Sequence, residues 1–577
     1  MDFFTKVKQA GRALYKFGAQ VQDKVVVCSV NCPELLIVEY GCFINRMATV
    51  PVYSYTSSAQ FSYIAKDTDV SIIFVGGYGQ YEMAFKYCRE YPGKIKRIVI
   101  LDNSPVSSTP DDVEVLSWDE FMAYGDDPSV KEKIQERAMS GSPDDIATII
   151  YTSGTMGDPK GVIITQKMYE HQTKQHLALL DYLKENLISL SFLPMSHVFE
   201  KTWQHFCVVK GLRIAFNRDP RMLETTLQEI QPDIMCCVPR FWEKIYSGIM
   251  ENYEKRSWLG RLAVRRAIHV GAKVNIKYLN NDKRVPPLLW REYQIWNHRF
   301  FRLARRKVGI TNGVFFPTAG APLSDKIIHF MRAIGIELVY GYGMTETTAT
   351  VACFPRYGYE IGTVGHPLKD VEMKIDNSGE ILVKGPTITP GYYHNEEANK
   401  RCFTEDGWFK TGDGGFIDKK GDLILSTRKK DMIKTSTGKY VAPQVSEALW
   451  ASNRYIDEVA IVGEGMKYIS ALVVPNFGYL EKWAYDNKIS YADREELCNH
   501  PQVKEFMLHE MQNAQCDMAE YEKVKQITLL TDPFSVEKGE VTNTMKLRRA
   551  IISNNYAHHI SQMYPDEFLD KDFEGDE

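Results

Sequence analysis

The sequence predicts an α/β fold in its first half, followed by a sheet-rich region and a smaller α+β module. In the first half, short β-branched runs alternate with helical stretches, as in parallel sheets covered by helices. After residue 370, apolar and polar residues alternate on both sides of glycine-containing turns, which is typical of β-hairpins. A chain of 577 residues also exceeds what one hydrophobic core usually supports, so we expect several domains.

The predicted strands of the first half are short apolar runs bounded by turn residues. A helix is predicted over residues 33–46, between the first two runs. Another buried strand, residues 146–153, leads directly into a glycine-containing loop. The four earlier strands are predicted at residues 25–30, 48–53, 71–76 and 97–101.

The later elements are mainly predicted hairpins. Residues 371–385 alternate around an Asn-Ser-Gly turn, and residues 416–426 and 459–475 repeat the pattern. A helix is predicted from Pro443, because proline suits the first turn of a helix.

The composition excludes several classes of protein. With 44% apolar and 25% charged residues, the chain is not mainly disordered. Seventy basic and seventy-four acidic side chains give a net charge of −4, which predicts no nucleic-acid binding. The eleven cysteines include no CxxC pair, so we expect buried thiols in a reducing compartment and no zinc site. Without a membrane-span pattern or a secretory signal, a cytoplasmic location is expected.

One segment departs from this charge balance. Residues 255–307 contain fifteen Lys and Arg but only two acidic residues, so their net charge is +13 and that of the remaining chain is −17. A basic surface is attracted to the anionic inner face of a cell membrane, and we expect peripheral contact there. A pair of helices with ordinary solvated faces explains the pattern equally well.

The loop YTSGTMGDPKGV (residues 151–162) gives the strongest chemical signal. Small hydroxyl residues, glycines and a lysine after a buried strand can surround phosphate with backbone N–H groups and hydroxyls. The spacing is not that of a Walker A loop. By composition alone, the segment could equally be an ordinary Ser/Gly turn.

This loop resembles the phosphate loop of the adenylate-forming enzymes, the superfamily of acyl-CoA synthetases, luciferases and peptide-synthetase adenylation domains. Other segments resemble further motifs of that superfamily, in its order. These are AGAPL (319–323), YGYGMTETTA (340–349), WFKTGD (408–413), STRKKDMIKTSTGKYVAP (426–443) and NTMKLRR (543–549).

Two other segments resemble long-chain fatty acyl-CoA synthetases of bacterial type in particular. They are SLSFLPMSHVFEKTW (189–203) and MCCVPRFWEKIYSGIM (235–250). The chain departs from the family pattern at Thr427, where an Asp is common, and at Gly414, where a bulky residue is usual.

The resemblance implies two domains. Residues 1–429 would form a large N-terminal AMP-binding domain of two α/β subdomains and a β-rich, barrel-like subdomain. Residues 430–577 would form a small, mobile α+β catalytic domain with its hinge at Lys430.

The resemblance also implies ATP, Mg²⁺ and CoA, and a role for each motif residue. Glu346 would bind Mg²⁺, whose preferred ligands are hard oxygens, and Thr345 would contact the α-phosphate. Asp413 and Arg428 would bind the ribose. The β- and γ-phosphates would lie against Thr152, Ser153, Gly154, Thr155 and Lys160, and the adenine against Ala319, Gly320, Ala321, Gly341, Tyr342 and Gly343.

Four more residues receive roles in the acyl and transfer steps. His197 would line the acyl or nucleotide pocket, and Trp242 would gate a fatty-acid tunnel, although each residue alone suits an ordinary core position. Lys546 would assist adenylation, while Lys434 and the loop at Gly438 would assist thioester formation. Most lysines are simply exposed charges, which is the alternative for both.

The implied function is ATP-dependent ligation of a long-chain fatty acid to CoA through an acyl-adenylate, with release of AMP and pyrophosphate. A medium-chain or aryl-CoA ligase and a fatty acyl-AMP ligase are the alternative enzymes. A non-catalytic lipid-binding protein or membrane scaffold is a third possibility from a different class.

Overall fold

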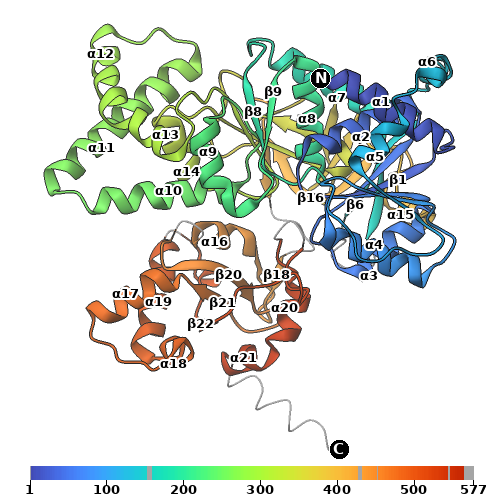
Figure 1. Ribbon diagram of the computed structural model, residues 1–577. Helices are drawn as coiled ribbons and strands as arrows, with labels where there is room; N and C mark the ends of the chain where they lie inside the picture. The colour runs from blue at the N-terminus through green and yellow to red at the C-terminus, as the bar shows by residue number, and fades with distance from the viewer. Residues whose placement is uncertain are drawn as a thin grey trace, which may run out of the picture.

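The computed structural model divides into a larger upper body, up to residue 426, and a smaller module below it, residues 432–564 (Figure 1). Within the part of the chain that is described, no helix combines the length and apolarity needed to cross a bilayer. The described residues are 2–152, 159–426, 432–450, 453–516, 518–542 and 546–564.

A seven-stranded sheet forms the N-terminal part of the upper body. Its strands lie in the order β5-β4-β3-β1-β2-β6-β7, and each neighbouring pair is parallel except the β6–β7 hairpin. The strands are β1 (Lys24–Cys28), β2 (Ala48–Val52), β3 (Ile72–Val75), β4 (Arg97–Ile100), β5 (Glu114–Ser117), β6 (Ile146–Thr152) and β7 (Lys160–Thr165).

Helices cover both faces of this sheet. Val25 of β1 belongs to the apolar cluster on one face, and its neighbour Val26 belongs to the cluster on the other. A strand buried on both faces is a continuous apolar run, which is why the strands and the helix predicted here are confirmed. The first face carries α1 (Phe3–Lys16), α2 (Pro33–Ile44) and α5 (Trp118–Tyr124), and the second carries α3 (Ser58–Asp67) and α4 (Tyr78–Glu90).

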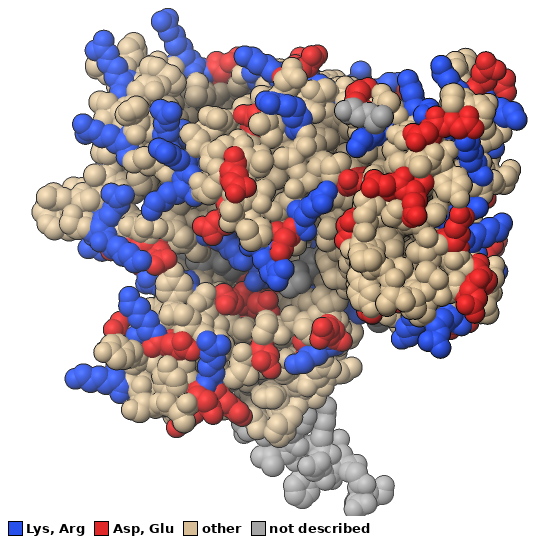
Figure 2. Space-filling view, in the orientation of Figure 1, with Lys and Arg blue, Asp and Glu red and all other residues tan. Residues whose placement is uncertain are grey.

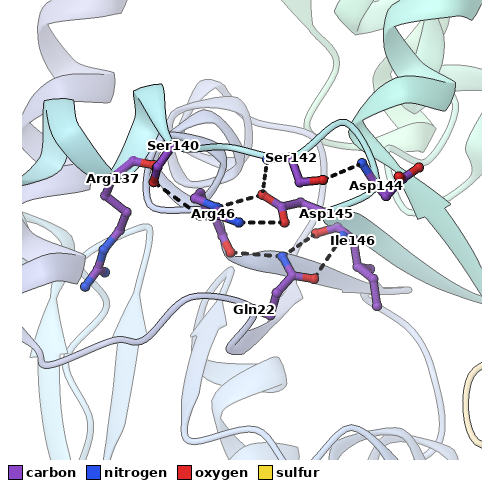
Figure 3. Close-up of polar contacts among 8 residues, drawn as sticks. All are labelled: Gln22, Arg46, Arg137, Ser140, Ser142, Asp144, Asp145 and Ile146. Carbon is purple, nitrogen blue, oxygen red and sulfur yellow. Dashed lines mark hydrogen bonds and ion pairs between the residues drawn. The ribbon is translucent and has the colours of Figure 1, made fainter.

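A polar network fastens the end of α2 to the segment before β6 (Figure 3). Arg46 donates from Nε and Nη2 to the two carboxylate oxygens of Asp145, at 2.8 and 3.0 Å. The Gln22 amide donates to the carbonyl oxygen of Arg46 at 3.0 Å and accepts from the Ile146 N–H at 2.9 Å. The network thus joins three segments that are distant in sequence.

Replacement of Asp145 by asparagine should lower the free energy of unfolding by about 2–3 kcal/mol, because charged hydrogen bonds to Arg46 are lost. Hydrogen bonding to Arg46 holds the pKa of Asp145 below its usual value. The charge therefore stabilises the fold above the pKa of an unfolded Asp, about 3.9, and its contribution is lost as the pH falls toward the lower native pKa.

Urea unfolding at neutral pH and below pH 3.9 measures this difference, which should shrink in acid. The adjacent Asp144 is exposed, so Asp144→Asn is a matched control with an expected change within about 0.5 kcal/mol. Equal losses in both variants would contradict the assignment.

A second group of mainly parallel strands follows in the chain. β8 pairs with β9, β10 pairs with β11, and single bridges at Ile234 and Cys237 join the two pairs. The antiparallel strands β12 and β13 continue this group beyond β11. The strands are β8 (Ile188–Ser191), β9 (Arg213–Phe216), β10 (Phe316–Thr318), β11 (Leu338–Met344), β12 (Ala349–Cys353) and β13 (His366–Pro367).

The chain between β9 and β10 is helical and forms the end of the upper body on the left in Figure 1. This end contains α9 (Leu223–Ile230), α10 (Pro239–Glu254), α11 (Trp258–Ala272), α12 (Pro287–Trp296) and α13 (Arg302–Val308). The other helices beside the second strand group are α7 (Gln166–Leu179), α8 (Val198–Lys210) and α14 (Asp325–Ala333).

The β-rich part is a four-stranded antiparallel sheet, so the hairpins predicted over 371–385 and 416–426 are confirmed. Its first turn contains Gly379 at φ +83°, a backbone angle that glycine adopts without strain. The strands are β14 (Glu372–Ile375), β15 (Glu380–Lys384), β16 (Phe409–Ile417) and β17 (Leu423–Ser426).

The C-terminal module is a small α+β unit around the three-stranded sheet β20-β21-β22. The hairpin predicted over 459–475 and the helix from Pro443 are confirmed. The strands are β18 (Ile433–Lys434), β19 (Tyr440–Val441), β20 (Ile456–Val462), β21 (Ser470–Pro475) and β22 (Gln526–Leu529). The helices are α16 (Pro443–Trp450), α17 (Phe477–Asp486), α18 (Arg494–Asn499), α19 (Pro501–Ala514), α20 (Arg549–Asn555) and α21 (Ala557–Gln562).

The cysteine prediction was partly wrong. Nine of the eleven thiols are buried, but Cys402 is half-buried and Cys516 is exposed near the end of α19. All eleven are free thiols.

The module contacts the upper body through α10. The Tyr479 hydroxyl donates to the Glu251 carboxylate at 2.5 Å, and Arg454 pairs with Glu254. At the other end of α10, the Arg240 guanidinium lies 3.7 Å from the Glu458 carboxylate. The Arg454–Glu254 ion pair has two exposed side chains, and such pairs contribute about 0–1 kcal/mol.

Candidate active site

The base of the predicted phosphate loop is the β6–β7 hairpin. Thr152 and Lys160 are directly paired across it, so they lie where the chain enters and leaves the loop. Three of the predicted phosphate residues, Ser153, Gly154 and Thr155, lie outside the described residues, as do Arg428 and the predicted hinge residue Lys430.

Lys160 lies close to Glu346, the predicted Mg²⁺ ligand, through Tyr392. The Lys160 ammonium is 5.1 Å from the centroid of the Tyr392 ring, and the Tyr392 hydroxyl donates to Glu346 Oε1 at 2.9 Å. Burial and the Glu346 charge raise the pKa of Tyr392, which keeps its hydroxyl protonated as a donor. The structure therefore brings a cation, a carboxylate and a phenol together at the loop.

Glu346 is set in a buried turn after β11. It is 7% exposed, and its backbone carbonyl accepts from the Thr389 N–H at 2.7 Å. Thr345, immediately before it, is also buried. A buried carboxylate close to the lysine of the predicted phosphate loop suits Mg²⁺, which prefers hard oxygen ligands.

The two predicted adenine-binding segments are adjacent. Ala319, Gly320 and Ala321 follow the end of β10, which pairs in parallel with β11, and β11 contains Gly341, Tyr342 and Gly343. The Tyr340 hydroxyl donates to the carbonyl oxygen of Ala321 at 2.9 Å and so ties the segments together. This edge contains the carboxyl ends of parallel strands, where ligands bind in open α/β sheets.

Gly343 shows why glycine is required in this segment. A Cβ at this position would lie 1.5 Å from the carbonyl oxygen of Ala349, at an irregularity in the β11–β12 pairing. Any other residue would force the two strands apart and displace the turn with Glu346.

Asp413, the predicted ribose ligand, reaches the same place from β16. Its Oδ2 accepts a hydrogen bond from the Tyr342 hydroxyl at 2.6 Å. A residue of the predicted adenine segment and the predicted ribose ligand are therefore in direct contact although 71 positions separate them.

His197 lies at the start of α8 and is influenced by Lys546 of the C-terminal module. His197 caps the start of α8, where its Nδ1 accepts from the Phe199 N–H at 3.3 Å. Burial and then the charge of Lys546 lower the pKa of His197 to about 4, so its ring is neutral at pH 7. Lys546 is exposed on the C-terminal module, and its charge acts on His197.

Lys434 lies elsewhere in this arrangement. It is exposed on the β18–β19 hairpin, and its ammonium lies 5.6 Å from the centroid of the Tyr440 ring. Gly438 forms the turn of that hairpin at φ +78°. These contacts are within the C-terminal module.

An apolar cavity lies behind the adenine segments. Ala319 and Gly341 line it, so it opens directly beside the nucleotide residues. Its volume is about 40 Å³, enough for about three water molecules. The remaining wall is formed by His176, Leu179, Leu180, Phe199, Thr202, Trp203, Phe206, Phe315, Pro317, Thr318, Val339, Ala349, Thr350 and Cys353.

Trp242 lies behind one wall of this cavity. The indole is fully buried, and its N–H donates to the Thr318 hydroxyl at 2.8 Å. It also packs edge-on against Phe241 and Phe316, with centroids 4.9 and 5.6 Å apart. Trp242 therefore fixes the position of Thr318, which lines the cavity.

Sequence reasoning missed two features of this region. Tyr392 was not predicted, because nothing in the sequence shows that residues 389–393 run beside β7, where Tyr392 bridges Val162. The buried pair of Lys201 and Glu39, 2.5 Å apart, was also missed. Burial raises the pKa of Glu39, but the charges of Lys201 and His205 lower it to about 2, so the pair is ionised. A lysine inside the motif SHVFEKTW, Lys201, was the sequence signal for such a buried pair.

Comparison with known proteins identifies the family. The AMP-binding enzyme family matches residues 1–393, and the AMP-binding enzyme C-terminal domain matches residues 430–567. The chain is 28% identical over 566 residues to long-chain-fatty-acid--CoA ligase FadD15 of Mycobacterium bovis, covering 97% of this chain and 91% of that one. It is 29% identical to long chain acyl-CoA synthetase 1 of Arabidopsis thaliana, covering 98% and 87%.

Solved structures share the fold at lower sequence identity. The adenylation domain of a carboxylate reductase from Mycobacterium chelonae superposes with a TM-score of 0.74 at 18% identity, covering 98% of this chain and 84% of that one. The anthranilate CoA ligase AuaEII in complex with anthranoyl-AMP gives 0.67 at 16% identity, covering 96% and 92%. The fold, the motif order and the match over more than half of its length show that the chain belongs to the AMP-binding enzyme family.

Proposed function

We propose that this protein ligates a long-chain fatty acid to CoA with ATP, through an acyl-adenylate. The observation that carries the proposal is that Ala319 and Gly341 belong both to the predicted adenine segments and to the wall of the apolar cavity. An acyl chain in the cavity would therefore present its carboxylate beside the nucleotide. The relatives named as long-chain ligases support the same substrate class.

Two steps make up the reaction. A carboxylate oxygen attacks the α-phosphorus of ATP, and the bond to pyrophosphate breaks. The CoA thiol then loses its proton and attacks the acyl carbonyl, and AMP leaves. In each step negative charge builds where cations can stabilise it.

The residues of the site suit these steps. Lys160 and the backbone of the loop would hold the departing phosphates, and Asp413 with Tyr342 would fix the ribose. Glu346 would hold Mg²⁺, which when bound offsets phosphate charge. Neutral His197 adds no charge to the pocket at pH 7.

We also propose that residues 1–429 and 430–577 act as two domains with a hinge at Lys430. The contacts that α10 makes with the module support a separable module, because they are exposed or partly exposed polar contacts. A cytoplasmic location, with contact at the inner face of the membrane through residues 255–307, completes the proposal.

Pyrophosphate exchange across a panel of acids, with and without CoA, tests the function against its alternatives. Long-chain acids should support exchange, and CoA should convert the adenylate to thioester. Preference for an aromatic or medium-chain acid would favour those ligases, and exchange without CoA transfer would favour an acyl-AMP ligase. No acid-dependent exchange would favour a non-catalytic lipid-binding protein.

Trp242→Ala should increase nucleotide-independent binding of fatty acid and leave adenylation in place. A cavity of about 40 Å³ is too small for a long chain, so its wall must move, and Trp242 holds the wall residue Thr318. Loss of the buried indole should also cost about 3–5 kcal/mol of stability.

Fatty-acid binding without ATP, measured together with a thermal melt, checks the role of Trp242. Tyr246→Phe, on the same helix, is a control that leaves the Thr318 contact intact. A lower melting temperature with unchanged fatty-acid binding would show that Trp242 is only a core residue.

A further inference from the structure

The basic helices α11–α13 carry an unusual set of exposed apolar side chains. Trp258 is 67% exposed, and Leu262, one turn later on α11, is 58% exposed. On α12, Leu288 is 80% exposed and Ile295 is 52% exposed. Single exposed apolar residues are common, but several on neighbouring helices mark a binding surface.

The apolar side chains share a helix face with cations. On α11, Trp258, Leu262 and Arg265 follow the i, i+4, i+7 spacing of one face, opposite the buried Val264 and Ala267. On α12, Leu288, Arg291 and Ile295 follow i, i+3, i+7. Each helix therefore has a solvent face of mixed apolar and basic residues.

The charge of this surface is largely uncompensated. Fourteen of the fifteen Lys and Arg between residues 255 and 307 are exposed, while Arg305 is half-buried. Among the described residues, the ion pairs of this segment are Lys255 with Glu251 and Arg266 with Glu292. Figure 2 shows Lys and Arg gathered over this end of the molecule, around uncharged atoms that protrude where α10 meets α11.

We propose that this surface docks on an anionic lipid bilayer, with Trp258, Leu259 and Leu262 inserted among the lipids. We call residues 255–262, at the α10–α11 connection, the tip. Anionic headgroups attract the surrounding Lys and Arg, while the acyl region accepts the apolar side chains. Nucleic acid is a poorer partner, because exposed leucines contribute nothing to phosphate contacts and do not stack on bases.

The position of the tip suits delivery of a membrane-soluble substrate. Helix α10 has Trp242 in its first turn, beside the cavity, and ends at the tip, and its 16 residues span about 24 Å. The docking surface deepens the proposed ligase function, since a fatty acid dissolved in the bilayer would be close to α10. Docking itself requires no ATP, CoA or fatty acid, so its test is independent of that function.

Flotation of the full-length protein with two vesicle types tests the proposal. One type contains phosphatidylcholine alone, and the other contains equal parts of phosphatidylcholine and phosphatidylglycerol. The protein should bind the anionic vesicles at low salt, bind the neutral ones weakly, and dissociate as salt screens the charges.

Two variants separate the apolar and electrostatic contributions. Trp258→Ser with Leu262→Ser, and Arg261→Gln with Arg265→Gln, should each weaken binding to anionic vesicles about tenfold or more. Tyr485→Ser, which removes a side chain that is 81% exposed on α17, is the matched control and should bind like the wild type. All of these side chains are exposed, so the melting temperatures should not change.

Insertion is distinguished from surface adsorption by lipids with brominated acyl chains, which should quench the wild type more than Trp258→Phe. Equal binding to neutral and anionic vesicles, absence of binding, or unchanged binding of both variants would overturn the proposal. The proposal would also be overturned if the same two variants lost self-association or RNA binding but bound vesicles like the wild type. The surface would then serve that other partner.

Discussion

Lys546→Ala should reduce acid-dependent pyrophosphate exchange by about 10²–10³-fold, the usual effect of removing one donor that stabilises transition-state charge. Lys546 is exposed on the C-terminal module, and its charge contributes to lowering the pKa of His197 at the predicted pocket. Transfer of the acyl group from supplied acyl-adenylate to CoA should stay within a few-fold of the wild type.

Lys538→Ala is a matched control for this variant, because Lys538 is an exposed lysine eight positions earlier in the same module. It should leave both half-reactions unchanged. Equal loss of both half-reactions in Lys546→Ala, with folding intact, would contradict a role confined to adenylation.

Lys434→Ala should have the opposite effect, with adenylation retained and thioester formation reduced by about 10²–10³-fold. CoA must enter where pyrophosphate leaves, so a single arrangement of the module serves both steps poorly. In this structure Lys434 contacts Tyr440 on its own hairpin, and rotation of the module would be needed to bring it to the adenylate.

Lys439→Ala changes another exposed lysine of the same hairpin and should leave the second step intact. Lys430→Pro, at the proposed hinge, should impair the second step more than the first. Single-turnover measurements of both half-reactions test these variants. Thioester formation at the wild-type rate in Lys434→Ala would rule out the exchange of lysines.

The proposed rotation would break the polar contacts of the module with α10. The ion pair of Arg454 with Glu254, both exposed, contributes about 0–1 kcal/mol, and Arg240 lies 3.7 Å from the largely buried Glu458. The hydrogen bond from Tyr479 to Glu251 adds about 1.5–3 kcal/mol.

Features governed by local pattern were predictable from the sequence. Strand β3, and β1 after its first residue Lys24, are apolar because helices cover both their faces. The β14–β15 hairpin turns at a glycine with positive φ. The motif residues Glu346 and Asp413 could be named through resemblance, but their contacts with Tyr392 and Tyr342 could not, because they depend on how separate segments pack.

The exposed apolar residues of α11 could not be predicted from the sequence, because their exposure depends on tertiary packing. Trp258 and Leu262 have the helical spacing of core residues, yet α11 buries Val264 and Ala267 instead. Which face of an amphipathic helix is buried depends on its neighbours. The cavity is likewise formed by side chains from α7, α8, β10, β11 and β12, which no single stretch of sequence reveals.

Release of AMP, measured with ATP, Mg²⁺, CoA and fatty acids from octanoate to eicosanoate, tests most directly whether this protein is a long-chain fatty acid ligase. We expect AMP release that requires both the acid and CoA, is highest with long-chain acids, and yields the acyl-CoA in equal amount. Absence of acid-dependent AMP release from the folded protein would contradict the proposed function.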